Sequence, residues 1–174
     1  MKKIYIVILS STLALFTSQS MAKAEVEVTW QEPEKYTDVR PANESRKHFR
    51  ESTFKKLDSY LTELAEELPS GHKLLINVDD LDLAGQVWPA SFVGLGHSAS
   101  DVRMIKSIDI PRMSFTYQLI DEAGQVIKES AVNLKDMSFQ DRFNPFFDSE
   151  SLRYEKNMLR EWFKDEFPKL LVKN

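Results

Sequence analysis

The first half of the chain shows two hydrophobic periods, one typical of a strand and one typical of a helix. Across residues 25–30, acidic and apolar side chains alternate, which predicts a half-buried strand. Apolar side chains then recur at spacings of three and four across residues 54–68, which predicts a long helix. Asn43 or Ser45 can cap the start of this helix, and Pro69 ends it because the residue before a proline avoids helical geometry.

The second half of the chain predicts three more strands. Residues 73–78 and 126–134 read as strands, and residues 102–121 predict a long strand that is broken or bulged at Pro111. A hairpin turn at residues 121–124 joins the last two strands, with a glycine that supplies the positive φ.

A final helix follows an aromatic-rich stretch and ends near Pro168. Asp148 or Ser149 can cap its start. Its stripe consists of Leu152, Glu155, Leu159, Trp162 and Phe163. The element order β-α-β-β-β-α predicts an α+β fold, a mostly antiparallel sheet of about four strands with two long helices packed on one face. The step from the first strand to the second would be parallel and right-handed.

The N-terminus has the pattern of a cleaved secretory signal peptide. Lys2 and Lys3 precede an apolar run of about a dozen residues, which is shorter than the ~20 residues that a membrane-spanning helix needs. The small residues Ala22 and Ala24 then form a cleavage site. We therefore expect residues 1–24 to be removed and residues 25–174 to form a single globular domain in the periplasm.

Charge and cysteine content narrow the classes of function. Loss of residues 1–24 would leave 20 basic and 27 acidic side chains, a net charge of −7. Nucleic acids and anionic membranes are poor partners for such a chain, because they attract cationic surfaces. The sequence contains no cysteine, which excludes thiol catalysis and zinc–thiolate sites. We expect no stable membrane insertion after cleavage.

Asp79, Asp80 and Asp82 form a dense acidic cluster just after a strand. An EF-hand loop starting at Asp80 fails because Ala84 stands at its fifth position. In a continuing strand, Asp80 and Asp82 would share one face with Val78 and Ala84, leaving Asp79 on the other. Two interpretations stay open. The aspartates either mark where the strand leaves the core and cap the loop behind it, or they bind a cation or small ligand.

The three histidines, His48, His72 and His97, are dispersed and lack the spacing of a helical zinc motif. His97 lies in a long loop, residues 79–101, where it is a weak candidate for metal binding with Asp80 and Asp82. A serine–His97 pair would have to form in the fold, and no GxSxG motif supports one. Without a catalytic motif, we expect neither an enzyme nor a cofactor.

Four aromatic residues fall in predicted loops rather than on buried stripes: Trp88, Phe92, Phe146 and Phe147. They either fold back over the edges of the sheet or form an exposed apolar patch for a protein or lipid partner. If they form a patch, they mark a partner-binding surface.

Several sequence segments are similar to a family of short exported proteobacterial proteins known as domain of unknown function 3016. They are VTWQEPEKYTDVRP, SRKHFRESTF, LPSGHKLLINVDDLDLAG, DIPRMSFTYQLIDEAGQVI, LKDMSF and RYEKNMLREWF. The resemblance covers residues 26–165 and implies export in a Gram-negative cell and one compact domain. It implies no activity, cofactor or catalytic residue.

The sequence thus favours a periplasmic, non-enzymatic binding or accessory module of the cell envelope, with another envelope protein as its expected partner. The alternative is a small ligand- or metal-binding protein that uses Asp79, Asp80 and Asp82 and the loop that follows them.

Overall fold

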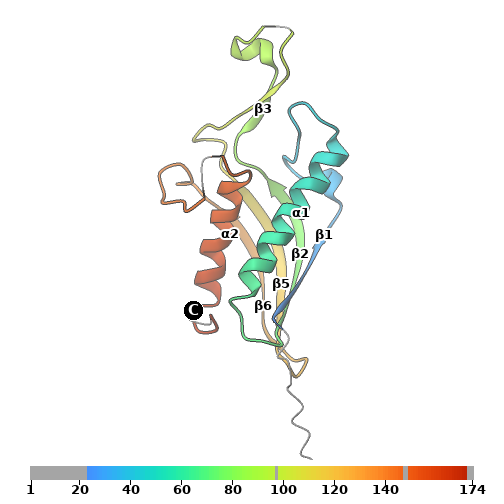
Figure 1. The fold of residues 1–174 in the computed structure, drawn as a ribbon, viewed down its shortest axis with the longest axis vertical. Helices are drawn as coiled ribbons and strands as arrows, with labels where there is room; N and C mark the ends of the chain where they lie inside the picture. The colour runs from blue at the N-terminus through green and yellow to red at the C-terminus, as the bar shows by residue number, and fades with distance from the viewer. Residues whose placement is uncertain (1–22, 97, 147–148, 172–174) are drawn as a thin grey trace, which may run out of the picture.

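The computed structural model describes residues 23–96, 98–146 and 149–171. Its main body has two layers, a four-stranded sheet and two α-helices that cover one face of the sheet (Figure 1). The strands are β1 (Glu25–Trp30), β2 (Lys73–Asp82), β5 (Arg112–Ile120) and β6 (Val126–Lys135). The helices are α1 (Arg46–Ala65) and α2 (Arg153–Glu166). The predicted α+β class is confirmed. The predicted signal peptide lies outside the described residues, except for Lys23 and Ala24.

The sheet has the strand order β1-β2-β5-β6 and is mostly antiparallel, as predicted. β1 pairs in parallel with β2, and the chain passes between them through α1. β2 pairs antiparallel with β5, and β5 pairs antiparallel with β6. Ile76 on β2 therefore lies between Val28 on β1 and Tyr117 on β5.

The core fills the space between the helices and the sheet. Trp162 of α2 packs edge-on against Phe115, with ring centroids 4.8 Å apart, and against Tyr117 at 5.6 Å. Leu57 and Leu61 of α1 are fully buried. Burial of each such side chain contributes about 1.5–3 kcal/mol. The opposite face of the sheet carries polar residues, as is usual where an antiparallel sheet faces water on one side.

The two helices begin in different ways. Ser45 caps α1, and its Oγ accepts a hydrogen bond from the backbone N–H of His48, so one of the two predicted caps is confirmed. The prediction that Ser149 caps α2 is wrong, because Leu152 adopts a left-handed conformation (φ 61°) and the helix begins at Arg153. Asp148, the other predicted cap, lies outside the described residues.

The prediction of one long loop at residues 79–101 is wrong, because strands occupy part of this range. β2 continues to Asp82, and a separate two-stranded ribbon forms from β3 (Gln86–Trp88) and β4 (Val102–Met104). A short 3-10 helix, η2 (Ala90–Val93), lies between them. Residues 86–96 and 98–104, here called the arm, project beyond the end of the main sheet, at the end of the molecule where α1 and α2 begin (Figure 1).

The strand predicted at residues 102–121 is broken before β5, as expected at Pro111, but the prediction that its two parts form one strand is wrong, because β4 and β5 belong to different sheets. A turn separates them, closed by a hydrogen bond from the N–H of Asp109 to the carbonyl of Lys106 at 3.0 Å. Pro111, which has no N–H to donate, directly precedes β5. The element order therefore gains two short strands over the one predicted.

Two further features complete the fold. A second 3-10 helix, η1 (Pro33–Lys35), follows β1. None of the helices in the described ranges is long and apolar enough to cross a membrane.

Candidate functional site

The acidic cluster lies at the end of β2, where a β-bulge interrupts the alternation of the strand between Val78 and Asp80. Beyond the bulge, Leu81 takes the buried face that Val78 occupies before it. Asp80 and Asp82 consequently lie on the opposite face from Val78. The prediction that they share its face is wrong, because the bulge inserts one residue and reverses the alternation.

Each of these two carboxylates has a partner within the protein. Asp80 accepts hydrogen bonds from the backbone N–H of Thr37 at 2.7 Å and from its hydroxyl at 2.6 Å. Asp82 forms an ion pair with Arg112, with 2.9 Å between Oδ2 and Nη1. Burial raises the pKa of Asp82 above its usual range, and the guanidinium of Arg112 opposes this. Asp79 is exposed.

The weak metal-binding candidates do not converge in the part of the chain that the structure describes. Among those residues there is no group of three histidine, cysteine, aspartate or glutamate side chains that could hold a metal ion. His97 lies outside the described residues. The geometry of Asp80 and Asp82 thus favours a structural role over a cation site.

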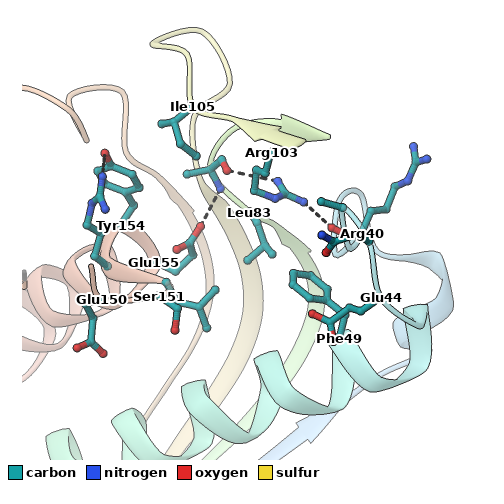
Figure 2. Close-up of a pocket in the computed structure, with 15 residues that line it drawn as sticks. Arg40, Glu44, Phe49, Leu83, Arg103, Ile105, Glu150, Ser151, Tyr154 and Glu155 are labelled. Carbon is teal, nitrogen blue, oxygen red and sulfur yellow. Dashed lines mark hydrogen bonds between the residues drawn. The ribbon is translucent and has the colours of Figure 1, made fainter. Parts of the chain in front are cut away.

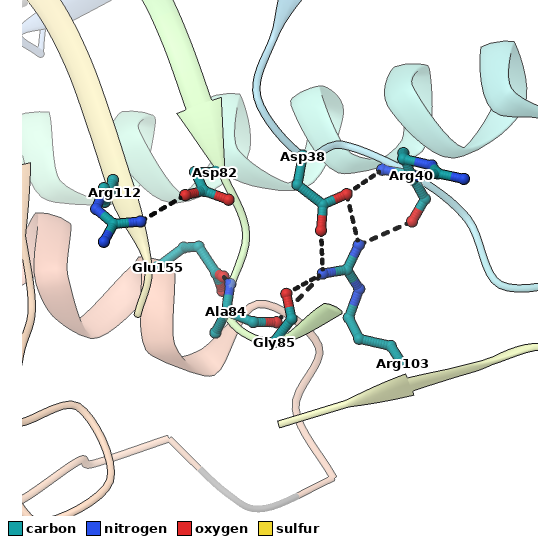
Figure 3. A network of polar contacts seen from close by, with 8 residues as sticks. All are labelled: Asp38, Arg40, Asp82, Ala84, Gly85, Arg103, Arg112 and Glu155. Atoms are coloured by element: carbon teal, nitrogen blue, oxygen red, sulfur yellow. Dashed lines mark hydrogen bonds and ion pairs between the residues drawn. The ribbon is translucent and has the colours of Figure 1, made fainter. Parts of the chain in front are cut away.

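Arg103 of β4 links the arm to the main body (Figure 3). Its Nη1 donates to Asp38 at 3.0 Å and to the carbonyl of Gly85 at 2.9 Å. Its Nη2 donates to the carbonyl of Arg40 at 2.9 Å. Charge-assisted hydrogen bonds of this kind fix geometry more firmly than neutral ones. The arm is therefore attached through a defined polar network.

The segment from Asp82 to Gly85 joins several parts of the chain. The N–H of Leu83 donates to the carbonyl of Asp38 at 3.1 Å, and the N–H of Gly85 to the carbonyl of Asp109 at 2.9 Å. Gly85 has a φ of 79°, and a Cβ there would lie 2.4 Å from the carbonyl oxygen of Met104. Only glycine permits this conformation and this close approach. The backbone structure therefore explains why the motif DLAG, residues 82–85, ends in glycine.

The arm carries exposed apolar side chains near its tip. Phe92 is 77% exposed and Leu95 is 57% exposed. Residues 83–100 contain no aspartate, glutamate, lysine or arginine. Trp88 lies on β3 rather than in a loop, and the ammonium of Lys106 sits 4.0 Å from the centre of its ring. Trp88 and Phe92 therefore belong to one projecting unit.

The other predicted partner-binding aromatics lie elsewhere. Phe146 is partly buried and packs edge-on against Tyr60 of α1, with ring centroids 5.3 Å apart. Phe147 lies outside the described residues. The four predicted residues do not form one surface within the described part of the chain: Trp88 and Phe92 are on the arm, and Phe146 borders the core.

A pocket of about 340 Å³ opens between the N-terminal ends of α1 and α2 (Figure 2). Side chains from both helix ends, from β4 and from the residues after β2 line it. Glu155, in the first turn of α2, forms part of its wall and is only 3% exposed. Its Oε1 accepts a hydrogen bond from the N–H of Ala84 at 2.7 Å.

Burial dominates the electrostatics of Glu155. It raises the pKa of this carboxyl above its ordinary value, while the hydrogen bond from Ala84 and the charges of Arg103 and Arg153 act in the opposite direction. A buried carboxyl in such a pocket can accept hydrogen bonds from a ligand, pair with a cation, or donate when it is protonated.

Sequence reasoning did not identify Glu155 or Arg103 as site residues. A signal existed for Glu155, because it is the one acidic residue in the otherwise apolar stripe Leu152, Leu159, Trp162 and Phe163. A charged side chain at a buried helix position needs a partner. No comparable signal existed for Arg103, whose partners are distant in sequence.

The model of a protein family described as a protein of unknown function, DUF3016, matches residues 24–165. No curated protein and no solved structure matches the chain.

Proposed function

The chain belongs to the DUF3016 family, and because the function of that family is unknown, we propose a role from the geometry: a non-enzymatic accessory protein of the cell envelope that binds another protein through its arm. The observation that carries this proposal is the exposure of Phe92 and Leu95 near the tip of the arm. Exposed aromatic and aliphatic side chains grouped in this way are typical of docking surfaces.

The attachment of the arm supports binding by a preorganised surface. Arg103 fixes the base of the arm through Asp38 and backbone carbonyls. A surface that is held in position before binding loses less conformational entropy on association.

Charge favours a protein over a membrane as the partner. The full chain has a net charge of −4, and residues 83–100 contain no lysine or arginine. Anionic lipid surfaces attract polybasic segments, and this tip offers none.

Export to the periplasm is part of the proposal. It rests on the basic, apolar and small-residue order of residues 1–24. The first strand begins at Glu25, so cleavage after Ala24 would leave every strand and helix of the fold intact.

A matched pair of double variants tests the role of the arm. Phe92→Ser with Leu95→Ser removes the apolar tip, and Phe143→Ser with Met137→Ser removes side chains that are 78% and 80% exposed away from the arm. We expect the amount of envelope partner that is isolated together with the arm variant to fall at least tenfold. The control variant should recover as much partner as the wild type. Both variants should keep the wild-type melting temperature, because none of the four replaced side chains is part of the core. Equal losses in the two variants, or no loss in either, would contradict the proposal.

The alternative function, binding of a metal or small ligand by Asp79, Asp80 and Asp82, has weaker support. Asp80 is bonded to Thr37 and Asp82 is paired with Arg112, so a ligand would have to displace partners already in place. A rise in melting temperature with calcium or zinc that Asp80→Asn abolishes would favour this alternative.

A further inference from the structure

The pocket between the helix ends has the dimensions of a small-molecule site. Its volume of about 340 Å³ falls at the lower end of the range of roughly 300–1,000 Å³ that such sites occupy. Apolar side chains supply much of its wall: Ala42, Phe49, Leu83, Ile105 and Leu152. A ligand that fills it therefore needs an apolar body of modest size.

The arginines around the pocket are directed to other partners. Arg103 is bonded to Asp38 and to backbone carbonyls, and Arg40 extends away from the pocket (Figure 2). Arg153 donates to the hydroxyl of Tyr154. These guanidinium groups are therefore not positioned to bind an anion inside the pocket.

The acidic side chains around the pocket differ in whether they already have a basic partner. Glu150 forms an ion pair with Lys156, and Glu44 lies at the rim, 3.7 Å from the imidazole of His48. Glu155 is deep in the wall, and its carboxyl accepts hydrogen bonds from the N–H of Ala84 and from its own backbone N–H. A carboxylate can accept about four hydrogen bonds, so Glu155 retains acceptor capacity toward a ligand.

From this arrangement we infer that the pocket binds a small organic amine with an apolar body, whose ammonium group pairs with Glu155. The apolar wall would bury the body of the ligand, and the pairing of charges would compensate for removing both groups from water. This inference does not depend on the arm and extends beyond the proposed function.

Three probes of similar size and different charge test the inference. Phenethylamine, 2-phenylethanol and 3-phenylpropionate are titrated into isotopically labelled protein, and amide shifts of Leu83, Ala84 and Glu155 are followed by NMR. We expect phenethylamine to bind at least tenfold more tightly than the other two. Tighter binding of phenylpropionate would overturn the inference in favour of an anion site, and no shift with any probe would overturn it outright.

Two variants assign the binding to the pocket. Glu155→Gln keeps an oxygen for the N–H of Ala84 but removes the charge, and should weaken phenethylamine binding at least tenfold. Glu63→Gln, at an exposed position of α1, is the matched control and should change nothing.

Ala42→Trp decides the question if Glu155→Gln does not fold, because it fills the pocket from a partly exposed position and leaves Glu155 in place. Undiminished amine binding by Ala42→Trp, or by a folded Glu155→Gln protein, would refute the inference. Phe92→Ser should bind the amine normally, which separates this result from the test of the arm.

Discussion

At the residue scale, single side chains decide how the segments of this protein meet. Arg103 joins the arm to the body, and Gly85 allows the backbone to pass close to Met104. Glu155 places a carboxyl where the rest of its helical stripe is apolar. Each is a local departure from the hydrophobic pattern, and each lies near the pocket or the base of the arm.

The buried carboxyl of Glu155 leads to a prediction about pH. Its pKa in the folded protein is raised above the ordinary value of 4.5, chiefly by burial and against the charges of Arg103 and Arg153. The folded state therefore holds this proton more tightly than the unfolded state does. The stabilisation is complete below the unfolded pKa and is lost as pH rises through the folded pKa.

Glu155→Gln should consequently gain stability relative to the wild type as pH rises from 4 to 8. The difference between the two unfolding free energies, measured by urea denaturation across this range, isolates the one carboxyl. Shifts at Asp58 and Asp82, also raised, and at Glu166, which is lowered, are present in both proteins and cancel. A pH-independent difference would show that Glu155 titrates alike in the folded and unfolded states.

At the scale of the elements, the long periodic segments could be predicted from sequence and the short ones could not. The alternation in β1 and the three-and-four spacing in α1 are strong because each element packs one face on the core. β3 and β4 have three residues each and depend on one another across the arm. No period can appear in three residues, so the sequence predicts a loop in place of β3 and the start of a long strand in place of β4.

The candidate site was harder to predict than the fold. The bulge after Val78 leaves no mark in composition, yet it decides which face Asp80 and Asp82 occupy. The bonds of Arg103 join residues 65 positions apart, at Asp38, and 18 apart, at Gly85. Contacts of that separation follow from the tertiary fold and have no local signature.

The arm should loosen when its polar attachment is removed. In Arg103→Leu, we expect hydrogen exchange at amides of β3 and β4 to accelerate by the equivalent of roughly 1.5–3 kcal/mol, the usual contribution of a hydrogen bond to a charged group. Amides of β5 should keep their protection. The matched control Arg112→Leu also removes an arginine–aspartate pair but lies on the sheet, and it should leave the arm unchanged. Unchanged exchange in the arm of Arg103→Leu would mean that the network does not hold it.

At the scale of the whole molecule, the fold consists of a two-layered body and two surfaces that we propose to bind partners, the arm and the pocket. The helices close one face of the sheet, and the other face is polar. The arm and the pocket both lie at the end where the helices begin (Figures 1 and 2). Composition predicted an acidic, cysteine-free single domain, and periodicity predicted its two layers, but the grouping of both surfaces at one end follows only from the way the chain crosses the sheet.

The central claim is that the arm binds another protein of the envelope, and photo-crosslinking in the native host tests it most directly. A photoreactive amino acid is placed at position 92 and, as a control of equal exposure, at position 143. We predict one discrete covalent adduct with an envelope protein from position 92 and none from position 143. No adduct from position 92, or the same set of adducts from both positions, would contradict the claim.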